Sequence, residues 1–258
     1  MDSKELINDL INISKNAGNA ILEIYNSNTE NFGIDYKDDN SPLTKADKAS
    51  DRIIYDGLKN IDNTIPILSE EGKNIKYNTR KKWDKFWLVD PLDGTKEFIK
   101  KNGEFTVNIA LIKDGEPILG VVYAPVLETI WYGSIQTGSF IIEANKTKKI
   151  NVLSSNNDLP IKIVSSRSHS NNVKLEKFLE KIEKYELIKM GSSIKICLVA
   201  DGRAHLYPRF GPTMEWDTAA AHAVVKFAGG KIINLDNEKE LSYNKEELLN
   251  PEFMVQYN

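Results

Sequence analysis

The chain has 258 residues, of which 41% are hydrophobic and 28% are charged, and its formal net charge at pH 7 is −3. This composition is typical of a globular protein with a substantial core, and it argues against a general binder of nucleic acids or membrane surfaces. One cysteine excludes an intrachain disulfide framework, and three scattered histidines make oxygen ligands the expected metal chemistry. No apolar run has the length of a membrane span and no secretory signal is visible, so we expect a cytoplasmic protein.

The first half of the chain predicts helices followed by a mostly antiparallel sheet. Apolar residues spaced three and four apart predict an amphipathic helix over residues 3–25. Thr44 is placed to cap a second helix, and Asp47 falls in its first turn, where a carboxylate favours the helix dipole. An Asp-Gly turn between two apolar runs predicts a hairpin. The predicted strands of this half cover residues 65–68, 86–89, 106–112, 118–123, 129–132 and 139–142.

Two carboxylates lie close together at the end of a predicted buried strand. Pro91 cannot donate a ladder hydrogen bond, so we expect the chain to turn at Asp90. The resulting loop also carries Asp93, Gly94 and Thr95. Carboxylates this close repel each other unless a cation lies between them, and hard divalent cations prefer oxygen ligands. Asp-Pro and Asp-Gly are also common turn dipeptides, so the loop alone is better explained as a plain turn.

Two further acidic elements change this interpretation to a magnesium site. Glu70, followed by Glu71, lies at the carboxyl end of a short predicted strand, where open α/β sheets place their ligands. The alternative for this pair is a solvated turn. Asp217 lies in the first turn of a helix that Gly229 is placed to end, and the alternative is a carboxylate that only complements the helix dipole.

The second half of the chain alternates strands and helices. Hydroxyl groups at Ser192 and Ser193, at the start of a predicted helix, suit the binding of a phosphate. A plain capped helix with Cys197 in the core is equally compatible with this segment. Strands are predicted at residues 161–164 and 204–209, and helices at residues 172–183, 191–200 and 215–228.

A polar segment, residues 143–158, is the expected boundary between two halves. The N-terminal α+β half, residues 1–150, carries most of the candidate metal ligands. The C-terminal α/β half, residues 151–258, carries Asp217 and the candidate substrate-binding residues.

Three separated motifs together resemble the signature of the lithium-sensitive, magnesium-dependent inositol monophosphatase superfamily. The motifs are Glu70-Glu71, the sequence DPLDGT at residues 90–95, and the sequence WDTAA at residues 216–220, closed by Gly229-Gly230. Further segments are similar to the bacterial CysQ-type 3′(2′),5′-bisphosphate nucleotidases of that superfamily. They are residues 93–98, 102–111, 191–195 and 206–213. Met214-Glu215 departs from the pattern often found before the last tryptophan, outside the metal-binding positions.

The resemblance implies an α/β fold, a layered α-β-α-β-α sandwich of the inositol monophosphatase and fructose-1,6-bisphosphatase type. It also implies two or three Mg²⁺ ions at the junction of the two halves. The ligands implied for the first ion are Glu70, Asp90 and the Leu92 carbonyl, and those for the second are Asp90, Asp93 and Asp217. Four carboxylates would offset the charge that the metals and a phosphate dianion bring together.

The resemblance also implies catalytic and substrate-binding residues. Asp47 and Thr95 resemble the pair that orients and deprotonates the attacking water, with the Thr95 hydroxyl as relay. His169 matches a position where related nucleotidases place a ring against adenine. The implied substrate-binding residues are Gly94, Thr95, His169, Ser192, Ser193, Lys195 and Arg209.

The resulting hypothesis is a phosphomonoesterase that converts adenosine 3′,5′-bisphosphate to AMP and phosphate, with the sulfated analogue as a second expected substrate. The alternatives are an inositol monophosphatase, whose metal site would look the same in sequence, and a catalytically idle nucleotide-binding member of the fold. The implied partner is a small nucleotide, with no nucleic-acid polymer and no transmembrane segment. The sequence leaves open the oligomeric state and any peripheral attachment to the inner membrane.

Overall fold

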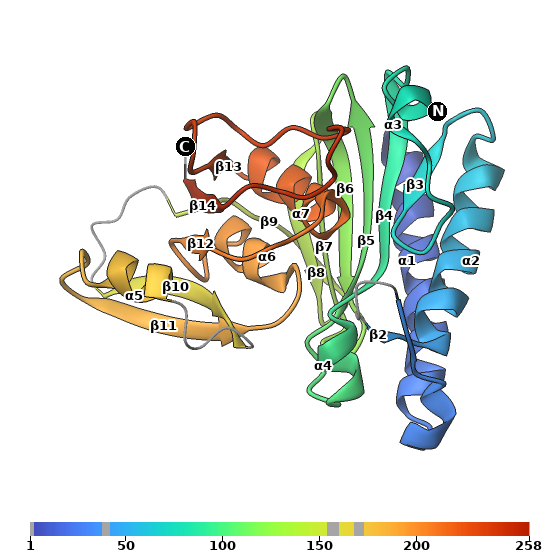
Figure 1. Ribbon diagram of the computed structural model, residues 1–258, viewed down its shortest axis with the longest axis horizontal. Coiled ribbons are helices and arrows are strands. Elements are labelled where there is room, and N and C mark those ends of the chain that lie inside the picture. The colour runs from blue at the N-terminus through green and yellow to red at the C-terminus, as the bar shows by residue number, and fades with distance from the viewer. Residues whose placement is uncertain (1–2, 38–41, 154–159, 168–172, 258) are drawn as a thin grey trace.

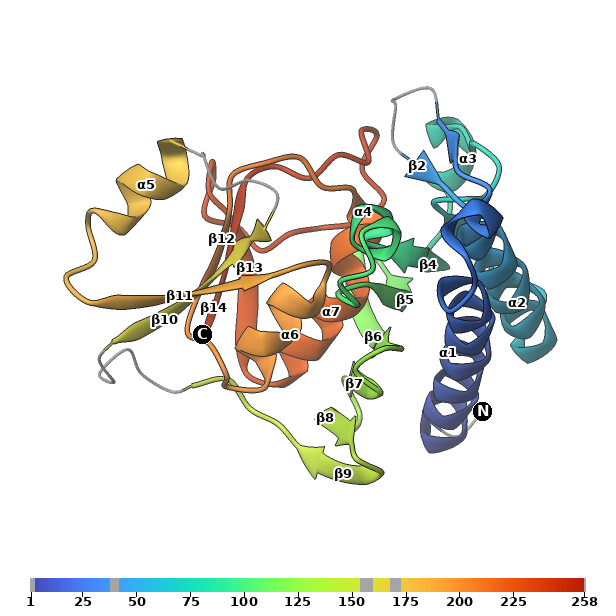
Figure 2. The same ribbon diagram turned by 90° about the horizontal axis from the view of Figure 1, so that it is seen from below.

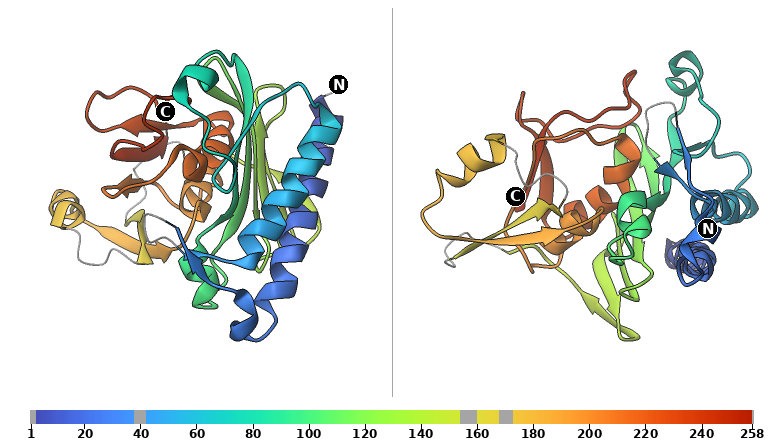
Figure 3. Two further views of the ribbon diagram at one scale, coloured as in Figure 1. Left: turned by 45° about the vertical axis from the view of Figure 1, so that its right-hand side comes forward. Right: turned by 60° about the horizontal axis from the view of Figure 1, so that its bottom comes forward.

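The structure is a computed structural model that describes residues 3–37, 42–153, 160–167 and 173–257. Its elements are stacked in successive helix, sheet, helix, sheet and helix layers (Figure 1). Two further directions of view show the same order, with the blue N-terminal helices on one side and α5, Val173–Leu179, on the other (Figures 2 and 3). The layered α/β sandwich expected from the sequence is therefore present.

A seven-stranded sheet forms the larger β layer, with its strands in chain order. The first two strands pair in parallel, and each later neighbour pairs antiparallel. The predicted hairpin is confirmed, because Asp114 and Gly115 both adopt positive φ angles, of 52° and 79°, in the two-residue turn between its strands. The strands are β3 Ile67–Ser69, β4 Lys85–Asp93, β5 Thr106–Lys113, β6 Glu116–Ala124, β7 Thr129–Ser134, β8 Gly138–Glu143 and β9 Lys146–Lys149.

Two long helices, α1 (Ser3–Tyr25) and α2 (Lys45–Ile61), cover one face of this sheet. The apolar stripe of α1 is buried, as its spacing predicted, and its Leu10 and Ile21 join one hydrophobic cluster with strand residues such as Val121. The segment between the two helices contains η1 Thr29–Phe32, β1 Asp35–Tyr36 and β2 Pro42–Leu43.

Helix α7, Glu215–Phe227, lies across the opposite face and contacts strands β4 to β8. The approach is close because small residues meet there: a Cβ added to Gly120 in β6 would lie 2.2 Å from the carbonyl oxygen of Ala220. Any side chain at Gly120 would push the helix off the sheet. The small alanine side chains of α7 thus allow the helix to pack close to the sheet.

The smaller β layer holds strands that the sequence patterns did not all reveal. The strands Tyr185–Met190, Gly230–Asn234 and Phe253–Tyr257 were not predicted, and neither was β9 in the larger sheet. A three-stranded sheet has the order β12 (Tyr207–Arg209), β14 (Phe253–Tyr257) and β13 (Gly230–Asn234), beside a parallel pair of β10 (Ile161–Ser166) and β11 (Tyr185–Met190). Helix α6, Ile194–Ala200, lies with α7 in the layer between the sheets.

The expected turn at Asp90 is wrong in its position. Strand β4 continues to Asp93, but its register against β5 shifts, with Asp90 opposite Asn108 and Asp93 opposite Thr106. One extra residue is therefore accommodated in β4, and Pro91 lies in this bulge, where its missing N–H costs no ladder hydrogen bond. The bulge keeps both aspartates at the end of one strand.

The division near residue 150 stays a prediction. One hydrophobic cluster contains Leu88 and Trp131 from before this point together with Ala220 and Val255 from after it. No helix among the described residues is long and apolar enough to cross a membrane.

Candidate active site

Three carboxylates from distant parts of the chain converge at one edge of the larger sheet. Ligand oxygens of Glu70, Asp90 and Asp217 all lie within 4.8 Å of one another. Glu70 directly follows β3, and its backbone N–H donates to the Val89 carbonyl of the neighbouring strand at 3.1 Å. Asp217 comes from the first turn of α7, where its Oδ2 accepts from the Met214 N–H at 2.8 Å. The fold thus brings together three of the four predicted acidic ligands, and these three residues, Glu70, Asp90 and Asp217, are here called the acidic group.

The fourth predicted ligand, Asp93, lies beside this group and points partly away from it. Its Oδ2 accepts hydrogen bonds from the Ser192 hydroxyl at 2.7 Å and from the Ser193 N–H at 2.5 Å. Its charge is still close enough to raise the pKa of Asp90 and of Asp217. Asp93 therefore links the acidic group to the segment that precedes α6.

The acidic group carries more negative charge than its surroundings neutralise. Burial raises the pKa of Asp90 well above its ordinary value, and the charges of Glu70, Asp93 and Asp217 raise it further. The pKa of Glu70 is also raised by burial, although the Lys37 ammonium, 2.8 Å from Glu70 Oε1, opposes this. Lys37 also lies 2.5 Å from Glu71. Carboxylates held this close without enough cations form a site suited to a divalent ion.

Asp47 and Thr95 meet beside the acidic group. The Thr95 hydroxyl donates to Asp47 Oδ1 at 3.2 Å, and the other oxygen of Asp47 accepts from the Thr44 N–H at 2.7 Å and the Thr44 hydroxyl at 2.6 Å. Thr44 caps α2 as predicted, so Asp47 has both a capping role and a partner across the site. Burial raises the pKa of Asp47, while its bonds from Thr44 and Thr95 lower it.

Gly94 gives Thr95 its position. It adopts a φ of 94°, in the left-handed region, and it immediately precedes the short helix α4, Thr95–Ile99. A Cβ at Gly94 would also lie 3.1 Å from the Glu104 carbonyl oxygen. The turn therefore requires glycine for backbone conformation and for space.

A cavity of about 130 Å³ adjoins the acidic group, and two basic side chains line it. Lys195 and Arg209 both line it, together with Asp93 and Asp217. Burial lowers the pKa of Lys195 to about 8, and the charge of Asp93 opposes that shift. The guanidinium of Arg209 donates to the carbonyls of Gly211 at 3.2 Å and Pro212 at 2.9 Å, which fixes its orientation.

The two serines before α6 differ from their predicted capping role. Ser193 is the N-cap of α6, yet its hydroxyl makes no capping bond and instead donates to Asn108 Oδ1 at 2.9 Å. Ser192 has a φ of 54°, which is unusual for a residue other than glycine, and its hydroxyl contacts Asp93 and, at 2.5 Å, Thr106. Both hydroxyl groups therefore bind residues of the neighbouring strands β4 and β5 and do not cap α6.

Sequence reasoning missed two charged residues at this site. Lys37 lies in a polar stretch with no motif, so nothing in its neighbourhood signalled its contact with Glu70. Glu97 lines the cavity and its pKa is raised by burial. Its place one turn into the helix after Gly94 was the available signal. The predicted His169 lies outside the described residues.

A model of the inositol monophosphatase family matches residues 2–256 of the chain. The chain belongs to the inositol monophosphatase family. It is 45% identical over 251 residues to the 3′(2′),5′-bisphosphate nucleotidase CysQ of Escherichia coli strain K12, a match that covers 97% of this chain and 99% of that protein. The corresponding nucleotidase of Haemophilus influenzae is 34% identical over 255 residues, with 98% and 93% covered.

A crystal structure of CysQ from Bacteroides thetaiotaomicron matches with a TM-score of 0.88 and 41% identity, covering 99% of this chain and 98% of that one. An inositol monophosphatase from Thermotoga maritima has a TM-score of 0.78 at 23% identity, which demonstrates the shared fold alone. Membership of the inositol monophosphatase family and the layered fold are therefore confirmed.

The acidic group fits the magnesium ion on which phosphatases of the inositol monophosphatase family generally depend. All of its donors are carboxylate oxygens, which hard divalent cations prefer to nitrogen or sulfur. The mutual repulsion that raises the pKa of Asp90 is relieved when a divalent charge lies between the carboxylates. Both the chemistry and the electrostatics of the residues present are compatible with Mg²⁺.

Proposed function

We propose that the protein is a Mg²⁺-dependent 3′(2′),5′-bisphosphate nucleotidase that hydrolyses adenosine 3′,5′-bisphosphate to AMP and phosphate. The observation that carries this proposal is 45% identity to a CysQ nucleotidase over nearly the whole of both chains. The cavity beside the acidic group supports it, since Lys195 and Arg209 offer positive charge where a second phosphate could bind. The sulfated analogue is proposed as a further substrate.

Glu70, Asp90 and Asp217 would hold Mg²⁺ between them, and Asp93 and the Leu92 carbonyl would extend the site to two or three ions. Bound there, Mg²⁺ supplies positive charge that stabilises phosphoryl oxygens and makes water more acidic. The chain's own part in the proton transfer falls to Thr95 and Asp47. The Thr95 hydroxyl accepts the proton of the attacking water as its own proton passes to Asp47 Oδ1. The water oxygen bonds to phosphorus while the bond from phosphorus to the 3′-oxygen breaks, and the 3′-oxygen takes up a proton from solvent to give the hydroxyl of AMP.

Substrate selection would fall to the cations of the cavity. A nucleotide bisphosphate carries a 5′-phosphate that inositol 1-phosphate lacks, so a nucleotidase needs positive groups beyond the metal site. Lys195 is held by its bond to the Ser192 carbonyl at 2.5 Å, and Arg209 by its own loop. Rigid cations lose little conformational freedom when a phosphate binds, which favours their use for recognition.

The function is tested by parallel phosphate release from adenosine 3′,5′-bisphosphate, inositol 1-phosphate and fructose 1,6-bisphosphate, each with Mg²⁺ and with EDTA. We expect the nucleotide to be hydrolysed most efficiently of the three substrates, and phosphate release to occur with Mg²⁺ but not with EDTA. Millimolar lithium is expected to inhibit the reaction, as the family resemblance implies. Preferred hydrolysis of inositol 1-phosphate would replace the proposal with its main alternative. Release that persists in EDTA would contradict the metal assignment, and nucleotide binding without any release would indicate an idle member of the fold.

Arg209→Ala is expected to raise the KM for adenosine 3′,5′-bisphosphate by about 10-fold or more, because a hydrogen bond to a charged group contributes roughly 1.5–3 kcal/mol. Hydrolysis of a small phosphomonoester without a second phosphate should change little. The matched control is Arg203→Ala, which removes an arginine from the turn that follows α6, where it pairs with Asp201. Equal losses on both substrates would instead assign Arg209 to the metal site or to the fold.

A further inference from the structure

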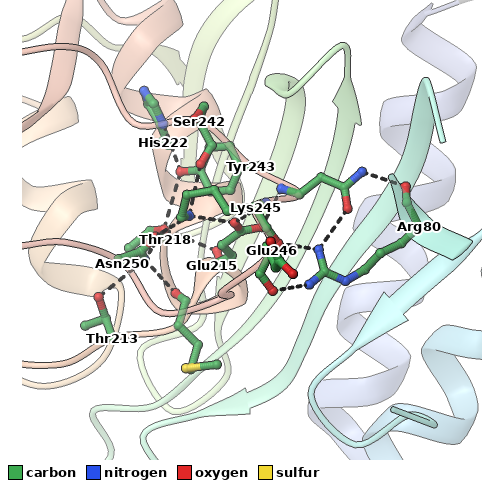
Figure 4. Close-up of polar contacts among 12 residues, drawn as sticks. Arg80, Thr213, Glu215, Thr218, His222, Ser242, Tyr243, Lys245, Glu246 and Asn250 are labelled. Carbon is green, nitrogen blue, oxygen red and sulfur yellow. Dashed lines mark hydrogen bonds and ion pairs between the residues drawn. The ribbon is translucent and has the colours of Figure 1, made fainter. Parts of the chain in front are cut away.

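Glu215, the first residue of α7, is fully buried and bonds entirely to a loop near the C-terminus. Its Oε2 accepts from the Asn244 N–H at 2.6 Å, and its Oε1 accepts from the Lys245 N–H at 3.0 Å and the Lys245 ammonium at 2.6 Å (Figure 4). A buried carboxylate is unfavourable unless it is paired and hydrogen-bonded in this way. Glu215 therefore fastens the start of α7 to residues 244–245.

Arg80 holds the same loop from the opposite side. It is the last residue of α3, Tyr77–Arg80, and its side chain is almost fully buried. The guanidinium donates to the Glu246 carbonyl at 2.7 Å, to the Asn244 side chain at 3.2 Å and to the Lys245 carbonyl, and the Asn244 amide donates back to the Arg80 carbonyl at 2.8 Å. Figure 4 shows Arg80 extending from its own segment toward this loop. Helix α3 lies shortly after Glu70 in the chain.

Asn250 provides a third attachment, next to the metal site itself. Its side-chain amide donates to the Met214 carbonyl at 2.8 Å and contacts the Thr218 hydroxyl at 3.1 Å. Met214 is the residue whose N–H binds Asp217 Oδ2 at 2.8 Å. Residues 244–250, here called the brace, thus contact both sides of the turn that carries Asp217.

The brace spans the two segments whose carboxylates must be held together. Glu70 precedes α3, Asp217 follows Glu215, and the side chains of Arg80 and Glu215 both bind Asn244 and Lys245 of the brace. Like charges within 4.8 Å push these segments apart in the absence of a cation. A rigid connection that opposes this repulsion keeps the site in a geometry ready for metal, as outer groups that orient ligands do elsewhere.

We propose that the brace sets the position of Asp217 relative to Glu70, and that Glu215 and Arg80 are positioning residues for Mg²⁺ binding. This inference rests on the proposed metal site. Neither residue lines the cavity beside Lys195 and Arg209, and both act on the metal ligands through the brace. Replacing them should weaken metal binding more than substrate binding, a pattern that a general loss of stability does not produce.

The test compares Glu215→Gln and Arg80→Lys with wild type by calorimetric Mg²⁺ titration of the metal-free protein and by the Mg²⁺ dependence of phosphate release. We expect the Mg²⁺ affinity of each variant to fall by about 10-fold, the order seen for outer partners of metal ligands, and raised Mg²⁺ to reverse the loss of activity. The KM for the nucleotide at high Mg²⁺ should change less than the Mg²⁺ affinity. The control is Asp201→Ala, which removes the acceptor of the 2.8 Å Trp131 hydrogen bond away from the metal site.

The outcomes separate this inference from the function on which it rests. If the variants lose thermal stability as Asp201→Ala does but bind Mg²⁺ like wild type, the brace is only structural and the inference is overturned. If wild type itself binds no Mg²⁺, the proposed function fails instead. Should Glu215→Gln not fold, Lys245→Met removes the partly exposed ammonium alone and is expected to give a smaller loss of Mg²⁺ affinity. An unchanged affinity in that folded variant and in Arg80→Lys would equally overturn the inference.

Discussion

Asp90→Asn is expected to lower phosphate release from adenosine 3′,5′-bisphosphate by at least about 100-fold, the upper range for groups that only support a metal ligand. The same change should raise the melting temperature of the metal-free protein. Asp90 is buried among like charges, and asparagine can still accept the 3.0 Å hydrogen bond from the Leu92 N–H. Each 1 kcal/mol of relieved repulsion corresponds to about 2–4 °C for a chain of this size.

The stability difference between Asp90→Asn and wild type should depend on pH. The pKa of Asp90 in the folded protein lies above its value in the unfolded chain, so its ionised form costs stability at neutral pH. As the pH falls below the raised pKa, the carboxyl group becomes protonated in the folded protein, and the cost shrinks until it is gone below the pKa of the unfolded chain. The stability advantage of Asp90→Asn should therefore be largest near neutral pH without metal, and it should shrink on acidification or when Mg²⁺ is added.

Thermal melts with EDTA and with Mg²⁺, at neutral and acidic pH, measure these shifts. Asp56→Asn, on the exposed side of α2, is the matched control and should change neither activity nor melting temperature appreciably. A metal-free Asp90→Asn protein that is less stable than wild type would mean that the carboxylates are not strained by repulsion. Wild-type turnover in a folded variant would contradict the metal site.

Some parts of the fold were predictable because short-range patterns determine them. The apolar stripe of α1 and the positive-φ turn at Asp114-Gly115 are both encoded within a few residues. Strand β11 is different, since its residues show no regular alternation of burial and its partner β10 is reached only through a crossover. The bulge in β4 depends on pairing with β5, so Pro91 indicated an irregularity but not its form.

The candidate site follows the same division between local and long-range signals. Glu70, Asp90 and Asp217 stand at element ends that the sequence revealed, but their convergence depends on how α7 packs on the sheet. The capping role of Asp47 was visible in its spacing from Thr44. Its contact with Thr95 was implied only by family resemblance, since no local rule relates residues 48 positions apart. The brace was not foreseen, because its hydrogen bonds join loops distant in sequence.

Helix α6 illustrates a long-range override in detail. The pattern predicted a helix from residue 191, and the structure begins it at Ile194. Ser192 adopts a left-handed conformation instead, and its hydroxyl binds Asp93 from the other half of the chain. A hydrogen bond to a charged carboxylate contributes about 1.5–3 kcal/mol. It can therefore outweigh a local helix preference of roughly a few tenths of a kcal/mol.

Thr95→Ala is expected to lower kcat by about 10²- to 10⁴-fold, the usual contribution of a positioned proton-transfer group. The Mg²⁺ affinity should stay within a few-fold of wild type, because the acidic group of Glu70, Asp90 and Asp217 is untouched. Thr95 is the cleaner position to change, since Asp47 also accepts the two capping bonds from Thr44 and its loss would disturb α2. Phosphate release at saturating Mg²⁺ measures the effect.

Thr95→Ser is the matched control, because it keeps the hydroxyl and should retain most of the activity. The double variant Thr95→Ala with Asp47→Asn extends the test, since two groups that act on one proton are not additive. If the Thr95 hydroxyl passes a proton to Asp47 Oδ1, adding Asp47→Asn to Thr95→Ala should lower kcat only slightly further. Fully multiplicative losses would show that the two residues act separately, and an unimpaired Thr95→Ala enzyme would remove Thr95 from the reaction.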